Sequence, residues 1–201
     1  MLDAKINAAL RPALDRAGAS LARAGIGADH VTLAGGAVSL LACLSVALGW
    51  LLGALALLAL SRLLDGLDGA VARASLRTDR GGFLDIALDY VLYAGLPLAF
   101  AVLEPAYNAL PAAALLAAFL LNGTAFLAFA ALALRRGLAT SAQGPKSFYF
   151  MAGFAEGFET IAVFAAACLF PAAFPWLAWG FAALCLASAV SRILTGWRML
   201  A

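Results

Sequence analysis

Six apolar runs dominate the chain, and each is long enough to cross a lipid bilayer as a helix. One helical span needs about 20 predominantly apolar residues. The runs cover residues 31–49, 53–74, 82–103, 112–134, 147–170 and 176–195. Hydrophobic residues make up 65% of the chain, against about 45–50% apolar residues in a soluble domain. A soluble core cannot bury this surplus, so we predict an all-α integral membrane bundle of six transmembrane helices, formed by residues 31–201.

Residues 1–30 precede the first run and form a separate cytoplasmic or interfacial segment. Apolar residues recur there at four-residue intervals, at Ile6, Leu10 and Leu14. This spacing predicts a short helix lying in the membrane interface. Pro12 is expected to bend that helix or to start a second piece of it. A solvated leader is the alternative.

The positions of Lys and Arg predict the orientation, because these residues are retained on the cytoplasmic side of a membrane. With the N-terminus inside, none of the 13 Lys and Arg residues falls in the outer connections 49–53, 104–111 and 170–176. We therefore expect a bacterial inner (cytoplasmic) membrane protein with both termini in the cytoplasm. The link between the second and third spans is then cytoplasmic as well.

Four aspartates lie beside that link, within two apolar runs. They are Asp65, Asp68, Asp85 and Asp89. Each residue turns an α-helix by about 100°, so the first two share one face of the second span and the last two share one face of the third. The link is short, which predicts that the two spans are antiparallel neighbours. We therefore expect one pocket with four carboxylates, open to the cytoplasm.

Four unpaired anions at this depth would be costly or would become protonated. Arg62 and Arg73 cannot neutralise all four, whereas divalent cations can. Ligation by carboxylates alone favours hard ions such as Mg²⁺, Mn²⁺ or Ca²⁺ over zinc. Four carboxylates can hold two such ions, the arrangement that supports phosphoryl-type displacement. Gly69 and Ala72 would leave room for a flat base or a pyrophosphate, and Arg73 would meet phosphate.

The same acids have a second interpretation. They can belong to salt bridges or to an ion pathway, as in a divalent-cation transporter or channel. Such a protein would need no small residues and no arginine at these positions of the second span, which favours the enzyme. The active site is therefore our first expectation.

The whole string reads D-x2-D-G-x2-A-R-x7-G-x3-D-x3-D, from Asp65 to Asp89. It resembles, position for position, the motif of the CDP-alcohol phosphotransferase family (CDP-alcohol phosphatidyltransferase, class I) of integral membrane enzymes. The six-span layout agrees with that family too. The resemblance implies transfer of a substituted phosphate group from a CDP-alcohol, most often CDP-diacylglycerol, to a second alcohol, with release of CMP. It also implies a role in phospholipid biosynthesis, membrane lipids as surroundings and a homodimer.

The resemblance also implies roles for individual residues. Asp65, Asp68 and Asp85 would be metal ligands, and Asp89 would ligate the second metal and act as the catalytic base. Two ions, Mg²⁺ or Mn²⁺, would be bound. Contacts to the CDP part of the donor would come from Gly69, Ala72, Arg73, Thr78 and Gly81.

The first span opens differently from the family pattern. Where the family has a P-N-x-x-T-like stretch, this chain reads "ADHVT". Thr32 matches the pattern and would contact the donor. Ala28 and Asp29 depart from it, and Asp29 would then contact the cytosine or the ribose.

Two groups of charged residues are alternative candidates for binding the acceptor. Glu156 and Glu159 can bind amino or hydroxyl groups, or pair structurally with Arg62 or Arg192. Lys146 can bind a phosphorylated acceptor, or serve topology and contact with anionic lipid together with its basic loop. The three cysteines stand singly and are expected to be small buried apolar residues. A net charge of +2 gives no support to a nucleic-acid partner.

Overall fold

The computed structural model describes residues 2–136 and 157–200, and every regular element in those two ranges is helical. The predicted all-α class is therefore confirmed. The helices are α1 (Leu2–Arg23), α2 (Ala28–Ala47), α3 (Leu51–Ala74), α4 (Asp79–Leu103), α5 (Pro105–Arg135), α6 (Gly157–Leu169), the 3₁₀ helix η1 (Pro171–Ala173) and α7 (Phe174–Met199).

Four segments of the described chain are long and apolar enough to cross a membrane. They are α2, α4, α5 and Pro171–Met199. The 24-residue α3 is long enough but carries Arg62, Asp65 and Asp68 among its apolar residues. Helix α6 has 13 residues, and the predicted fifth span begins outside the described residues. The count of six spans therefore stays a prediction.

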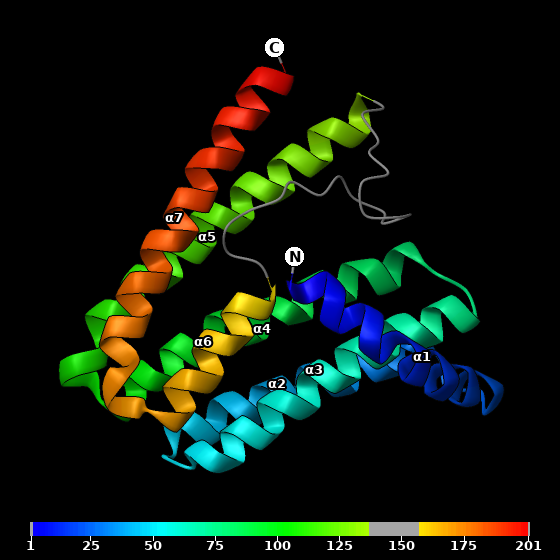
Figure 1. The fold of residues 1–201 in the computed structure, drawn as a ribbon, viewed down its shortest axis with the longest axis horizontal. Coiled ribbons are helices and arrows are strands. Elements are labelled where there is room, and N and C mark those ends of the chain that lie inside the picture. The colour runs from blue at the N-terminus through cyan, green and yellow to red at the C-terminus, as the bar shows by residue number, and fades with distance from the viewer. Residues whose placement is uncertain (1, 137–156, 201) are drawn as a thin grey trace.

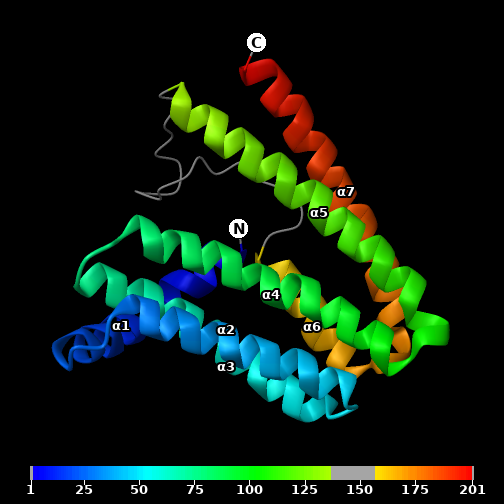
Figure 2. The ribbon, with the colours of Figure 1, turned by 180° about the vertical axis from the view of Figure 1, so that it is seen from behind.

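The helices form two arms that diverge from a common apolar base. Helices α5 and α7 pack against each other and form one arm, and α1 to α4 form the other (Figures 1 and 2). At the base, the rings of Phe100 and Phe174 stack with centroids 4.4 Å apart. Phe164 of α6 is buried in the same cluster. This packed base holds α4, α6 and α7 together.

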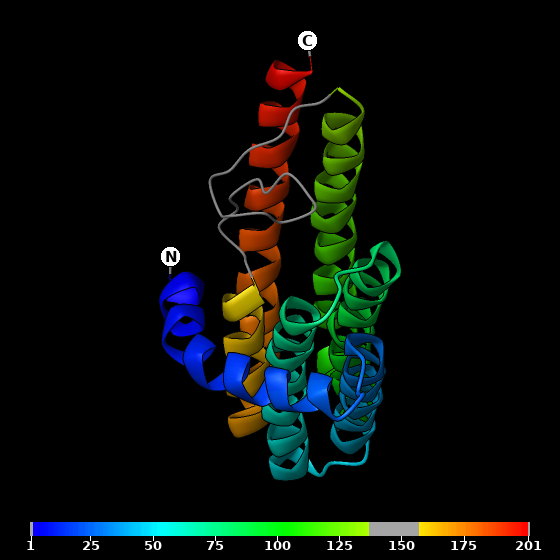
Figure 3. The same cartoon turned by 90° about the vertical axis from the view of Figure 1, so that its right-hand side faces the viewer.

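Helix α1 lies across the other helices of its arm instead of running along them (Figure 3). Pro12 lies inside this 22-residue helix and does not end it, so the expected second piece is not formed. The contact with α3 is close at Gly18, where a Cβ would lie 2.7 Å from the backbone carbon of Ala70. Glycine is therefore needed at this crossing. The N-terminal segment is therefore helical, and its place in the membrane interface stays a prediction.

The break predicted at residues 104–111 is much shorter than expected. Helix α5 begins at Pro105, directly after Glu104. Proline is well suited to the first position of a helix because its missing N–H would have no partner there. The buried Asn108 side chain donates a hydrogen bond of 2.9 Å to the carbonyl of Phe100 in α4. The same carbonyl also accepts a 3.2 Å hydrogen bond from the N–H of Glu104. The Asn108 bond therefore ties the start of α5 to the end of α4 across a tight turn that the residue types alone do not predict.

Helices α3 and α4 were expected to be packed neighbours, but each instead packs mainly against α2. Gly36 of α2 allows α4 to come close, whereas a Cβ on Gly35 would make an ordinary contact with α3. A Cβ on Gly35 would lie 3.5 Å from the Cβ of Leu64 in α3, and one on Gly36 would lie 3.0 Å from the side chain of Leu88 in α4. The acidic faces of α3 and α4 therefore border a polar space, which close packing of the two helices would have eliminated.

Candidate active site

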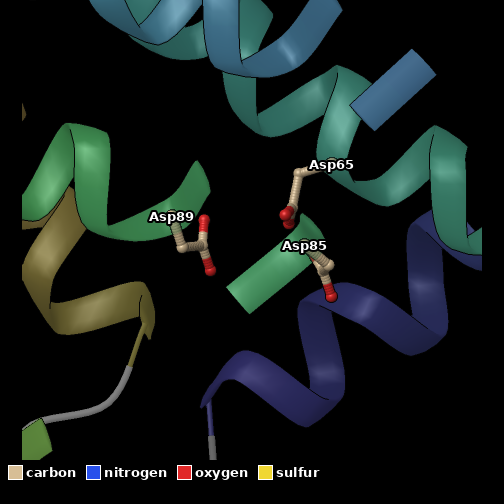
Figure 4. A group of neighbouring side chains, drawn as sticks. All are labelled: Asp65, Asp85 and Asp89. Carbon is tan, nitrogen blue, oxygen red and sulfur yellow. The ribbon is translucent and has the colours of Figure 1, made fainter. Parts of the chain in front are cut away.

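Three of the four predicted carboxylates gather between α3 and α4. Asp65 comes from α3, and Asp85 and Asp89 come from successive turns of α4 (Figure 4). Each offers one oxygen, and these three oxygens lie within 4.8 Å of one another. The spacing of four residues between Asp85 and Asp89 puts both on one face of the helix. The helical spacing in the sequence therefore predicted the shared face of Asp85 and Asp89, and the tertiary structure adds Asp65 to them.

The three oxygens fit a hard divalent cation. Mg²⁺ binds oxygen ligands at about 2.1 Å and Ca²⁺ at up to about 2.6 Å, so ligands on opposite sides of an ion lie about 4.2–5.2 Å apart. The separations in this group do not exceed 4.8 Å, so the three oxygens are close enough together to reach one such ion. The group contains no nitrogen or sulfur ligand, which is the donor set of Mg²⁺, Mn²⁺ or Ca²⁺. The site can therefore hold a divalent metal ion.

Asp68 lies in the same pocket but outside that group of three. It is buried and lines a small polar pocket together with Asp65, Asp85 and Asp89. Thr32 of α2, predicted to contact the donor, lines this pocket too. All four predicted carboxylates thus face one space. The role of Asp68 as a metal ligand stays a prediction.

Arg62 is a member of the site that the motif does not include. Its Nη1 donates a 2.9 Å hydrogen bond to Oδ1 of Asp89 and lies 3.8 Å from Oδ2 of Asp65. Its guanidinium therefore offsets part of the negative charge of the group. The available signal was its position three residues before Asp65 on the same helix face. The proposed pairing of Arg62 with Glu156 lies outside the described residues.

Arg73, predicted to meet the donor phosphates, pairs with α1. Its Nη2 and Nε donate hydrogen bonds of 2.6 and 3.1 Å to one carboxylate oxygen of Asp15. The hydrogen bond from Arg73 holds the pKa of the Asp15 carboxyl below its ordinary value. A Cβ on Gly69 would lie 3.3 Å from Nη1 of Arg73. The glycine therefore leaves the arginine space beside the helix backbone, and Ala72 is half-buried on the same helix.

The remaining residues that were predicted to bind the donor substrate lie together at the start of α4. The Thr78 hydroxyl accepts a 3.0 Å hydrogen bond from the N–H of Gly81 and so caps the helix. Asp29 of α2 accepts hydrogen bonds from Arg80, one of them 2.7 Å long. A Cβ on Gly81 would lie 3.1 Å from the Asp29 carboxylate. The structure thus brings Asp29, Thr78 and Gly81 together, with Arg80 as a partner that the motif does not include.

A second space opens on the other side of Asp89. It is a cavity of about 270 Å³ between α4, α5, α6 and α7. Asp89 lines both this cavity and the small acidic pocket. Arg192 of α7 is buried in the cavity wall, with its guanidinium 5.1 Å from the centroid of the Phe126 ring. A carboxylate suited to metal binding is therefore joined to a space suited to a small molecule.

The cavity also contains polar residues that the motif does not identify, among them Tyr90 and Asn122. Their signal in the sequence was a polar side chain within an apolar run, which marks a functional candidate in a membrane. Of the residues predicted to bind the acceptor, Glu159 lies on α6 and is half-buried. Lys146 and Glu156 lie outside the described residues.

The chain is similar to several known proteins. The family model for CDP-alcohol phosphatidyltransferase matches residues 26–191. The chain is 46% identical to the inner membrane protein YnjF of Escherichia coli over 197 residues, covering 98% of this chain and 96% of that protein. An archaetidylinositol phosphate synthase of Methanothermobacter thermautotrophicus is 48% identical over 68 residues, 33% of this chain and 35% of that protein. One from Pyrococcus horikoshii is 38% identical over 86 residues, 42% and 46% of the two chains.

Proposed function

Because the chain belongs to the CDP-alcohol phosphatidyltransferase family, we propose that it transfers a phosphatidyl group from CDP-diacylglycerol to a small alcohol. CMP is the second product, and the reaction is a step of phospholipid synthesis. The observation that carries this proposal is the position of Asp89, which borders both the acidic pocket and the 270 Å³ cavity. A donor phosphate near the carboxylates and an acceptor in the cavity would meet at this residue.

In this proposal Asp89 is the catalytic base. The acceptor oxygen forms a bond to the phosphorus that carries the diacylglycerol, and the bond from that phosphorus to the oxygen of CMP breaks. The acceptor proton passes to the Asp89 carboxylate. Asp65, Asp68, Asp85 and Asp89 would hold two ions, Mg²⁺ or Mn²⁺. When bound, such ions make the acceptor hydroxyl more acidic and stabilise the charge on the leaving group.

Donor binding is assigned to residues on both sides of the acidic pocket. Arg73 would contact a donor phosphate, with Gly69, Ala72 and Gly81 leaving room for the nucleotide. Asp29, Thr32 and Thr78 would contact its remaining polar groups. Arg73 already lies against Asp15, so binding of phosphate would make that arginine a bridge between donor and α1.

One relative and the charge pattern support a location in the inner membrane. The E. coli relative is named an inner membrane protein, and the three predicted outer connections carry no Lys or Arg. We propose that both termini and the active site face the cytoplasm. A homodimer surrounded by membrane lipids is the expected assembly, by resemblance to the family.

The names of the archaeal relatives make an inositol phosphate one acceptor to test. They cover less than half of this chain, so the panel of acceptors must be wider. Lys146 would bind the phosphate of such an acceptor, and Glu156 and Glu159 its hydroxyl groups. An amino alcohol would instead favour the two glutamates alone.

The test is release of CMP from CDP-diacylglycerol by the purified protein in detergent or lipid. The assay contains Mg²⁺ or Mn²⁺ and one acceptor at a time. We expect release with at least one acceptor and none after the metal is chelated. Absence of release with every acceptor and CDP-alcohol, together with divalent-cation flux in liposomes, would favour the transporter instead.

A further inference from the structure

Asn122 is a buried amide in the wall of the cavity beside Asp89. Its residue is 9% exposed, and its Oδ1 has no hydrogen-bond partner among residues 2–136 and 157–200. A buried carbonyl oxygen without a partner is costly, and such groups call for a water or a ligand. Because this oxygen only accepts hydrogen bonds, its partner must be a donor.

The neighbouring Gly123 brings Tyr90 to the same part of the wall. A Cβ at position 123 would overlap the Tyr90 hydroxyl and lie 2.9 Å from its Cζ. The Tyr90 ring packs edge-to-face on Tyr93, with centroids 5.8 Å apart. Tyr90 directly follows Asp89 in α4. The absence of a side chain at Gly123 therefore admits a phenol hydroxyl to the cavity that Asn122 and Asp89 also line.

The charge of the cavity narrows the chemistry of the ligand. The guanidinium of Arg192 and the carboxylate of Asp89 both line this cavity, so its lining holds charges of both signs and does not call for a charged group as the donor to Asn122. A neutral hydroxyl suits the position. The volume of about 270 Å³ is just below the ~300–1,000 Å³ of typical ligand pockets, so the molecule must be small.

We propose that Asn122 and Tyr90 bind a hydroxyl group of the acceptor other than the one that reacts, and hence that the acceptor is a small polyhydroxylated molecule. This inference rests on the proposed function, because it takes the cavity as the acceptor site. Holding a second hydroxyl fixes the orientation of the reacting one toward Asp89. Such positioning lowers the entropic part of the barrier.

The test compares acceptors that differ only in the number of hydroxyl groups. Three pairs serve this purpose: glycerol and 1-propanol, glycerol 3-phosphate and 3-hydroxypropyl phosphate, and myo-inositol 1-phosphate and 2-hydroxycyclohexyl phosphate. The phosphorylated pairs separate recognition of hydroxyl groups from recognition of phosphate. CMP release is measured with the intact membrane protein. The member with more hydroxyls is expected to have the higher kcat/KM, by roughly tenfold or more, because its analogue leaves the amide unpaired.

Variants of the cavity wall test whether Asn122 and Tyr90 cause the preference for acceptors with more hydroxyl groups. Asn122→Leu is expected to raise KM for the polyhydroxylated acceptor roughly tenfold, with KM for CDP-diacylglycerol unchanged. Asn122→Asp keeps an accepting oxygen and should retain most of the preference. Gly123→Ala should have a similar effect to Asn122→Leu, because it displaces the Tyr90 hydroxyl. Gly180→Ala is the matched control, since a Cβ there meets nothing within 4 Å.

The possible results distinguish failure of the hydroxyl-binding subsite from failure of the proposed transferase activity. CMP release that is equally fast with one-hydroxyl acceptors, or a preference that survives Asn122→Leu, overturns the subsite and leaves the transferase in place. Absence of CMP release with all acceptors overturns the transferase. In that case thermal stabilisation by the same compounds decides the subsite. Stabilisation by the polyhydroxylated members that is lost in Asn122→Leu supports it, and no stabilisation overturns it.

Discussion

Asp89 belongs to two environments at once, the acidic pocket and the larger cavity. We therefore expect Asp89→Asn to lower CMP release at least 100-fold, because general base catalysis contributes about 10²–10⁴-fold to rates. The amide is nearly isosteric, so donor binding should change little. Binding of CMP is the control measurement. Activity within a fewfold of the unmodified protein would show that another group accepts the proton.

Arg62 offsets part of the electrostatic repulsion among the carboxylates when no cation is bound. Its guanidinium contacts Asp89 at 2.9 Å, and removing one partner of a poorly solvated ion pair leaves an uncompensated charge. Arg62→Gln is expected to lower the melting temperature strongly in chelator. Added Mg²⁺ or Mn²⁺ should then recover more stability in the variant than in the unmodified protein. An equal loss with and without metal would contradict this neutralising role.

At the scale of one element, α1 is held on α3 by shape as well as by charge. Gly18 fits against Ala70 with no space for a side chain, and Asp15 binds Arg73 nearby. Gly18→Val should destabilise the protein by about 1–3 kcal/mol through overpacking and make α1 more accessible to limited proteolysis. The matched control is Ala17→Val, at an exposed position of the same helix. An equal response of both variants would mean that the crossing is not tight.

For the whole molecule, orientation can be measured with single introduced cysteines. Tyr107, which is exposed at the start of α5, lies in a predicted outer connection, and Arg77 lies in a predicted inner one. In intact cells of a cysteine-free variant, Tyr107→Cys should react with an impermeant thiol reagent, whereas Arg77→Cys should react only after lysis. The opposite pattern would invert the assignment of the active site to the cytoplasm.

Some residues of the candidate site could be predicted from the sequence and others could not, depending on whether they share a helix. Asp85 and Asp89 lie one helical turn apart, so their shared face follows from local geometry alone. Asn122 and Arg192 approach Asp89 from helices far away in the sequence, and no local period relates them. Polar character within an apolar run was the available signal for both, but it does not indicate what they face. Arg62 had a local signal, but its partner Asp89 lies on another helix.

Three features can be read along the chain: the helical class, the long apolar runs and the spacing of the acidic motif. Each depends on helix periodicity or on apolar length, which are local properties. The sequence by itself therefore determined that this is a helical membrane protein with aspartates gathered on two helix faces. Tertiary structure decided that α2 lies against both α3 and α4, that Asn108 closes a turn where a loop was expected, and that Asp89 borders a cavity. These features depend on contacts between distant segments, where the absence of a side chain at Gly36 or Gly123 determines how closely two helices approach.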